Sequence, residues 1–167
     1  MLSFDIRTLE SNPERVHAGL APTDPVWQDG DVRPVDVVHV TGRVSSAGSG
    51  RFYFSGHLEG EAAIDCRRCL TEVRVPVEAD VHLIFAEAED DEIDDPDVYT
   101  IDAKAAELDL RPAIREEWIL SVPAFALCRE ECAGFCPVCG ADLNDDPAHT
   151  HPAGDPRWDA LRELRNT

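Results

Sequence analysis

The most regular pattern in the sequence is an alternation of apolar and polar residues over positions 73–85. Every second side chain is apolar, and these are Val73, Val75, Val77, Ala79, Val81, Leu83 and Phe85. A period of two puts alternate side chains on opposite faces of a strand, so the pattern predicts a half-buried antiparallel β-strand. Pro76 has no N–H to donate, and the strand must therefore be an edge or carry a bulge at that point.

Further strands are predicted before this one. Residues 35–45 are rich in β-branched side chains, and positions 52–58 alternate apolar and polar residues. A third segment at about 60–66 leads into Cys66 and Cys69. A first strand could contain Phe4, Ile6 and Leu9.

One main helix is predicted at about 110–121. Leu110, Ile114 and Trp118 recur every four residues and form an apolar stripe that suits a core-facing helix. Asp109 is the expected N-cap, because a carboxylate can accept the free N–H groups of the first turn. Trp118 is expected in the core rather than in a ligand site.

Six cysteines and two late histidines carry the most specific chemistry. They form four pairs: Cys66/Cys69 (the first pair), Cys128/Cys132 (the second pair), Cys136/Cys139 (the third pair) and His149/His151 (the histidine pair). The first residues show no secretion signal, so metal binding or redox chemistry is expected rather than disulfides. Eight ligands would complete two closed tetrahedral sites, which predicts two Zn²⁺ ions per chain. Gly140 suits a metal-binding turn that a Cβ could obstruct.

Two divisions of these ligands are open. One groups the second and third pairs into one site and leaves the other pairs spare. The other joins the first pair to the second, and the third pair to the histidine pair. The latter is favoured because it uses every ligand and because zinc sites commonly join two pairs from separate segments. Otherwise, the histidine pair would be exposed polar residues with no ligand role.

The pattern predicts an α+β fold with two parts. Residues 1–127 would form an antiparallel β-sheet, which could close into a barrel, with the one main helix. Residues 128–167 would form a zinc-bound C-terminal appendage, because this segment is too small to bury a core and metal would replace the missing stability. A short final helix is expected where Trp158, Leu161 and Leu164 share one face.

The charge of the chain restricts its partners. Fifteen basic residues against 34 acidic ones give a formal net charge of −19. Non-specific nucleic-acid binding and binding to anionic membranes both depend on Lys and Arg, so we expect neither, and a basic protein is the expected partner. Solubility alone is the plainer explanation of the charge. No apolar run is long enough for a membrane helix, so the sequence predicts a cytoplasmic protein.

Residues 87–97 form the most acidic run, with eight carboxylates in eleven positions. A solvated loop is the favoured interpretation. A calcium loop is rejected, because the run lacks the central glycine and closing glutamate of the helix-loop-helix pattern. The run is also the natural surface for a basic partner.

Four segments together resemble a known family. They are CRRCL at 66–70, EEWILSVP at 116–123, CREECAGFCPVCGADLN at 128–144 and DPRWDAL at 155–161. The chain resembles the large ribosomal RNA subunit accumulation protein YceD family from about residue 35 onward. Many members carry a C-x-C motif where this chain has the histidine pair, and imidazole and thiolate are both good zinc ligands.

This resemblance implies a bacterial cytoplasmic factor that supports accumulation of large-subunit ribosomal RNA, with no enzymatic activity. A basic ribosomal or ribosome-assembly protein is then the expected partner, and Arg67, Arg68 and Arg74 could touch the RNA itself. Two other functions remain open. One is a thiol–disulfide redox protein that uses Cys66 or Cys136, although neither cysteine opens a helix that would lower its pKa. The other is a structural protein-interaction module with no RNA role.

Overall fold

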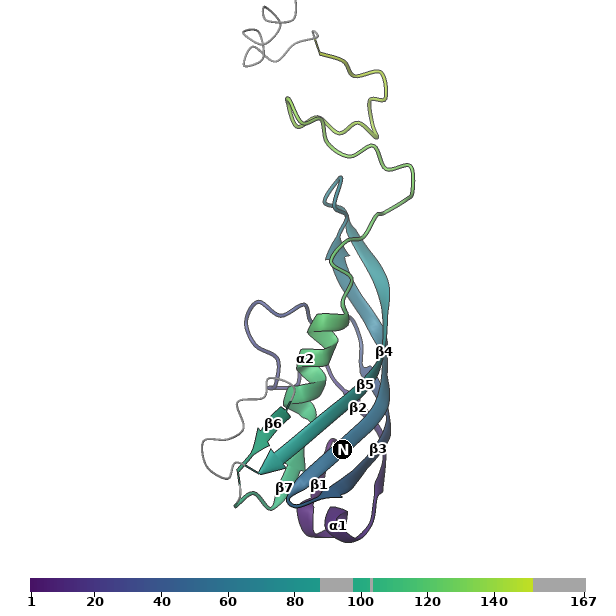
Figure 1. The fold of residues 1–167 in the computed structure, drawn as a ribbon. Coiled ribbons are helices and arrows are strands. Elements are labelled where there is room, and N and C mark those ends of the chain that lie inside the picture. Colours follow the sequence, from purple (N-terminus) through teal and green to yellow (C-terminus); the bar gives the residue numbers. More distant parts are fainter. Residues whose placement is uncertain (88–97, 103, 152–167) are drawn as a thin grey trace, which may run out of the picture.

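The protein is built on a five-stranded sheet with the strand order β2-β3-β4-β5-β6 (Figure 1). In this computed structural model, which describes residues 1–87, 98–102 and 104–151, the strands are Glu14–Leu20 (β2), Val38–Gly48 (β3), Arg51–Asp65 (β4), Glu72–Glu87 (β5) and Val98–Ile101 (β6). The first four are antiparallel neighbours, and β6 runs parallel to β5.

A second, two-stranded sheet and two helices complete the described structure. Strand β1 (Ser3–Asp5) pairs antiparallel with β7 (Glu107–Asp109), and the helices are α1 (Ile6–Ser11) and α2 (Arg111–Ser121). The predicted α+β class with one main helix is therefore confirmed. Neither described helix is long and apolar enough to cross a membrane.

The predicted strand at 73–85 is β5, and Pro76 lies where β5 forms an edge. Strand β6 pairs only with residues 84–87 of β5, so the described sheet has no neighbour beyond β5 at Pro76. The two remaining edges are β2 and β6, which are not paired with each other. Within the described residues the sheet is open, and the expected possibility of a closed barrel is not realised.

Two local predictions were wrong, and a third is displaced by one residue. Ile6 and Leu9 lie in α1 rather than in a first strand, because the Asp5 side chain caps a helix by accepting a hydrogen bond from the Thr8 N–H at 3.0 Å. The segment at 60–66 is the end of β4, not a separate strand. The N-cap position of α2 is Leu110, one residue later than expected, but the Asp109 carboxylate does accept a first-turn N–H, that of Arg111, at 3.0 Å.

The apolar stripe of α2 is buried as predicted. The side chains of Leu110, Ile114 and Trp118 are fully inaccessible to solvent. The Trp118 indole N–H donates to the Val32 carbonyl at 2.8 Å. Its ring lies against Gly60 of β4, where an added Cβ would come within 2.9 Å of a ring atom. Trp118 therefore packs α2 against β4 and bonds it to the chain that precedes β3.

Replacing Trp118 with alanine is expected to lower the free energy of unfolding by about 3 to 5 kcal/mol, because a large buried side chain and its cavity are involved. Leu120 on the same helix is 73% exposed and provides the matched control. Its replacement with alanine is expected to change the free energy by less than about 0.5 kcal/mol. Urea denaturation followed by tryptophan fluorescence and circular dichroism measures both. Equal losses in the two variants would contradict the packing.

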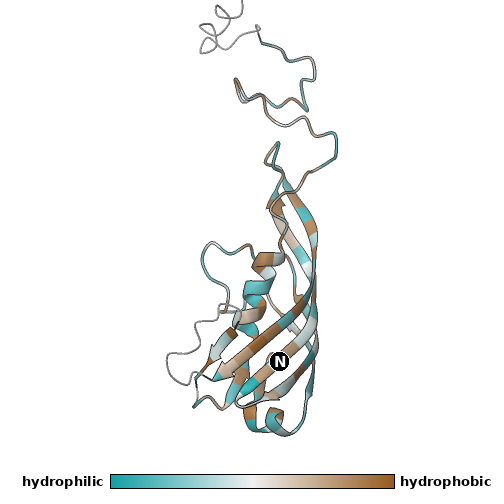
Figure 2. Ribbon diagram, in the orientation of Figure 1, coloured by the Kyte–Doolittle hydropathy of each residue, from teal (hydrophilic) through white to brown (hydrophobic). Residues whose placement is uncertain are grey.

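The hairpin of β4 and β5 extends beyond the rest of the sheet. Pairing of β3 with β4 ends at His39↔Glu59, whereas β4 and β5 stay paired as far as Asp65↔Glu72. The hairpin tip therefore projects from the body and meets the chain that leaves α2 (Figure 1). Figure 2 shows that hydrophobic and hydrophilic residues alternate along these strands. The projection takes the first cysteine pair away from the main core.

The segment after α2 has no helix or strand between residues 128 and 151. One isolated bridge joins Phe135 to Asp142. The division expected after residue 127 stays a prediction. The expected final helix around Trp158 lies outside the described residues, as does the acidic run apart from Glu87.

Candidate metal centres

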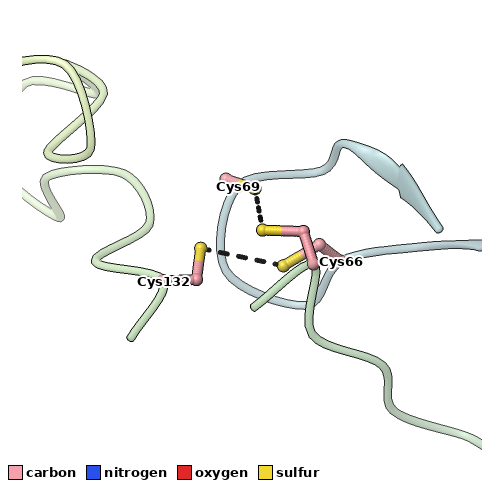
Figure 3. A group of neighbouring side chains, drawn as sticks. Cys66, Cys69 and Cys132 are labelled. Atoms are coloured by element: carbon pink, nitrogen blue, oxygen red, sulfur yellow. Dashed lines mark hydrogen bonds between the residues drawn. The ribbon is translucent and has the colours of Figure 1, made fainter. Parts of the chain in front are cut away.

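The first and second cysteine pairs meet at the hairpin tip. All four Sγ atoms of Cys66, Cys69, Cys128 and Cys132 lie within 4.8 Å of one another, and we call them the first group. Figure 3 shows Cys66, Cys69 and Cys132 converging from the hairpin and from the segment after α2. The backbone holds the two segments together, because the Arg67 N–H donates to the Ala126 carbonyl at 3.0 Å.

The sulfur distances in the first group suit a tetrahedral metal ion. The Sγ atoms of Cys66 and Cys132 are 3.9 Å apart, and those of Cys69 and Cys128 are 3.6 Å apart. A disulfide would require about 2.05 Å. Four thiolates at about 2.3 Å from one ion stand about 3.8 Å from each other. The four cysteines are free thiols with room for an ion between them.

The third cysteine pair and the histidine pair form a second group, Cys136, Cys139, His149 and His151, whose ligand atoms also lie within 4.8 Å of one another. The two Nε2 atoms are 3.0 Å apart, and each is 3.2 Å from one sulfur. A tetrahedral ion needs about 3.3 to 3.6 Å between such atoms, so small outward shifts would admit one. The Asp146 carboxylate lies 3.8 Å from Nδ1 of His149, where it can orient the ring.

The structure thus brings the eight side chains together in the division that the sequence favoured. The rival division is not observed, because the second and third pairs belong to different groups. The histidine pair points both Nε2 atoms at the third pair rather than standing apart from it. Two groups that could hold a metal ion are therefore present. Their role as ligands stays a prediction.

The two C-x-x-C turns share one backbone pattern. In the first, the Leu70 N–H donates to the Cys66 carbonyl at 2.9 Å, and in the second the Gly140 N–H donates to the Cys136 carbonyl at 2.8 Å. The residue after the second cysteine has a left-handed conformation in both, with φ of 57° at Leu70 and 76° at Gly140. An added Cβ at Gly140 would meet nothing within 4 Å. The expected steric obstruction there was wrong, and the constraint is the backbone angle.

Substitutions at Gly140 and Leu70 are expected to change the stability of the protein in opposite directions. A left-handed backbone costs a residue with a Cβ about 1 to 2 kcal/mol, so Gly140→Ala should destabilise the metal-loaded protein by about 1 kcal/mol. Leu70→Gly should raise stability, because the Leu70 side chain is 64% exposed and little packing is lost. Thermal unfolding of both variants with metal bound measures the effects. A fall in both melting temperatures would contradict the shared turn.

Backbone N–H groups favour thiolates in both turns. Burial of the Cys66 sulfur would raise its pKa, but the backbone N–H groups of Arg68 and Cys128 lower the pKa to about 6. The N–H groups of Cys139 and Val138 lower the pKa of Cys136 to about 6 against the opposing effect of burial. The pKa of Cys69 is also lowered, mainly by its hydrogen bond with the Thr71 hydroxyl. Each group therefore contains at least one sulfur prepared to be an anionic ligand.

Cys128 behaves in the opposite way. Burial of its sulfur, followed by hydrogen bonds with the neighbouring thiols, raises the pKa of Cys128 to about 12. Four sulfurs in close contact cannot all carry negative charge unless a cation compensates them. A divalent ion in the first group would supply that compensation, and the donor set fits a soft metal such as zinc.

The arginines of the hairpin tip are already engaged. Arg68 donates from Nη1 to the carbonyl of Cys132 at 2.6 Å, which ties the two halves of the first group. The Arg67 guanidinium lies 5.5 Å above the centre of the Phe125 ring. Arg74 is 4.0 Å from a Glu61 oxygen. The sequence offered no signal for the structural role of Arg68, because its partner is a backbone carbonyl in a distant loop.

Comparison with known proteins identifies the family of the chain. The sequence pattern of the large ribosomal RNA subunit accumulation protein YceD family matches residues 54–165. An uncharacterized protein of Mycobacterium tuberculosis is 29% identical over 164 residues, which cover 96% of this chain and 73% of that protein. The uncharacterized protein YlbN of Bacillus subtilis is 29% identical over 138 residues, which cover 80% of this chain and 77% of that protein. No solved structure matches. The family match spans more than half of the 167 residues and includes both groups, so the chain belongs to the large ribosomal RNA subunit accumulation protein YceD family.

Proposed function

We propose that this protein is a zinc-stabilised, non-enzymatic cytoplasmic factor that supports the accumulation of large-subunit ribosomal RNA through binding. The observation that carries the proposal is the family match, whose residues 54–165 contain both metal-binding groups. The family description relates the chain to large-subunit RNA. Metal ions bound at the two groups would stabilise the matched region. Two closed sites with four protein ligands each leave no free position for a reacting water.

Burial supports a stabilising role for the thiols over thiol–disulfide exchange. A reactive cysteine needs both a lowered pKa and access to its substrate. Cys66 has the lowered pKa but is fully buried, and Cys136 is only 6% exposed. Cys128 is exposed as a residue, but its sulfur lies among the other three sulfurs of the first group and its pKa is raised. None of these three thiols combines a lowered pKa with access to a substrate, as expected of structural metal ligands.

The partner proposed for this factor is a basic ribosomal or ribosome-assembly protein. The net charge of −19 repels a phosphate backbone at long range and attracts a basic surface. Two zinc ions and six thiolates would change the charge by −6 + 4 = −2 and would not reverse it. The arginines of the hairpin tip are poorly placed for RNA, because Arg68 is bound to the Cys132 carbonyl and Arg74 lies beside Glu61.

Depletion of the protein in its host tests the function. Large-subunit RNA is expected to fall relative to small-subunit RNA, and the wild-type gene should restore the ratio. A variant with Cys132→Ser should fail to restore it, whereas Leu120→Ala, an exposed change on α2, should succeed. An unchanged RNA ratio after depletion would contradict the proposal.

Affinity purification tests the partner. A basic ribosomal or assembly protein should be recovered at low salt after nuclease treatment and lost as salt is added, because screening weakens charge attraction. Direct binding of purified protein to naked large-subunit RNA, lost on replacing Arg67 and Arg74 with alanine, would show that RNA is the partner instead.

A further inference from the structure

Asn144 joins the two metal-binding groups. Its side-chain Nδ2 donates toward the Sγ of Cys132 at 3.7 Å, which is a ligand of the first group. Its Oδ1 accepts from the Ala133 N–H at 2.9 Å and from Arg129 Nη2 at 2.8 Å. Ala133 and Arg129 each directly follow a cysteine of the first group. One side chain therefore contacts a ligand sulfur and the two loop residues that position the second cysteine pair.

The position of Asn144 is set by the loop of the second group. The backbone N–H and the Nδ2 of Asn144 donate to Oδ1 of Asp142 at 2.8 and 2.7 Å. The Cys136 N–H donates to the Ala141 carbonyl at 2.8 Å, which closes the turn that leads to Asp142. The Leu143 N–H also donates to the Gly134 carbonyl at 2.8 Å. Asn144 thus extends from the turn that carries Cys136 and Cys139.

We infer that Asn144 is a positioning residue through which the second group controls the metal affinity of the first. The inference rests on the proposed binding of metal by both groups. An amide N–H directed at a ligand sulfur stabilises the thiolate and fixes its orientation, and loss of such contacts typically weakens metal binding about 10- to 100-fold. Metal at the second group orders the turn from which Asn144 extends. Metal at the second group therefore raises the affinity of the first, and the coupling is reciprocal.

Two variants of Asn144 and one control, all in the full chain, test its contacts. Asn144→Ala removes the donor and the acceptor. Asn144→Asp keeps the acceptor for Ala133 and Arg129 but loses the donor, and it directs a negative charge both at Cys132 and at the Asp142 carboxylate. Asp145→Ala is the matched control, because Asp145 is the exposed neighbour and makes no side-chain hydrogen bond or ion pair among the described residues.

Cobalt(II) is the probe, because the absorption spectrum of tetrahedral cobalt distinguishes four sulfur ligands from two sulfurs and two nitrogens. In competition with a chelator, both Asn144 variants should bind cobalt at the four-sulfur group about 10- to 100-fold more weakly than the wild type. The control should match the wild type. Retention of the sheet signal in circular dichroism shows that the variants are folded. An Asn144→Asp protein with the wild-type four-sulfur affinity would overturn the positioning role.

A double-mutant cycle tests the coupling itself. His151→Ala should weaken cobalt binding at the four-sulfur group several-fold in the wild-type background and have little effect in the Asn144→Ala background. Equal effects in both backgrounds would overturn the route through Asn144. A chain that binds no cobalt at either group would overturn the proposed metal binding and this inference with it. Two filled groups that respond independently would overturn the coupling alone.

Discussion

Chelation of the purified chain is expected to release two zinc ions and to unfold the segment after α2, while the five-stranded sheet stays folded. Between residues 128 and 151 the chain has no helix or strand, and the buried side chains around the first group form a cluster of their own, separate from the main core. A structural zinc ion typically contributes about 10 to 16 kcal/mol of binding free energy, so its loss should exceed what the short turns can replace. The core around Trp118 contains no ligand of either group.

Elemental analysis measures the zinc content, and hydrogen exchange followed by mass spectrometry locates the unfolding. Protection should disappear in residues 128–151 and persist in β3, β4 and the main part of β5. Chelator that is already saturated with zinc is the control and should have no effect. A content near one zinc per chain would contradict the division into two groups. A content near zero would contradict metal binding altogether, and loss of protection throughout the sheet would contradict the separation of the cores.

The elements that could be predicted from the sequence are those whose periodicity reports their burial. The alternation at 73–85 became β5, and the stripe of Leu110, Ile114 and Trp118 became the buried face of α2. Strand β2 could not be recognised, because only Val16 and Leu20 of its residues are buried and its other positions look like a loop. The start of α1 could have been predicted from Asp5, because aspartate is a favoured N-cap.

The members of the two candidate groups were predictable for a different reason. Cysteine and histidine carry metal chemistry in any fold, and counting ligands was enough to favour the observed division. Their supports were not predictable. Arg68 contacts a carbonyl in a loop 64 residues further along the chain. Asn144 contacts a sulfur and a backbone N–H that lie 12 and 11 residues before it. Such contacts between polar side chains and backbone depend on how two loops meet, which no local pattern encodes. The left-handed backbone at Leu70 could not be predicted, because leucine has no preference for that conformation.

Replacing either Cys69 or Cys132 with serine is expected to remove the same zinc ion, leaving one of two. Cys69 lies on the hairpin and Cys132 lies after α2, yet their sulfurs belong to one group. A serine hydroxyl is a poor substitute for a thiolate, and a four-ligand structural site that loses one ligand loses the closed coordination on which its stability depends. The double variant should therefore lose no more zinc than either single variant.

The matching pair in the second group is Cys139→Ser and His151→Ala, and each should remove the other zinc ion. Zinc in the first group should be retained at full stoichiometry in both, even where the coupling through Asn144 weakens its affinity. His57 provides the matched histidine control, because it lies on β4 and belongs to neither group. Its Nδ1 is 2.9 Å from Oδ1 of Asp80. His57→Ala should keep both zinc ions. If Cys69→Ser and Cys132→Ser removed different ions, so that the double variant lost both, the hairpin would not share a metal with the segment after α2. The projecting hairpin would then need another explanation.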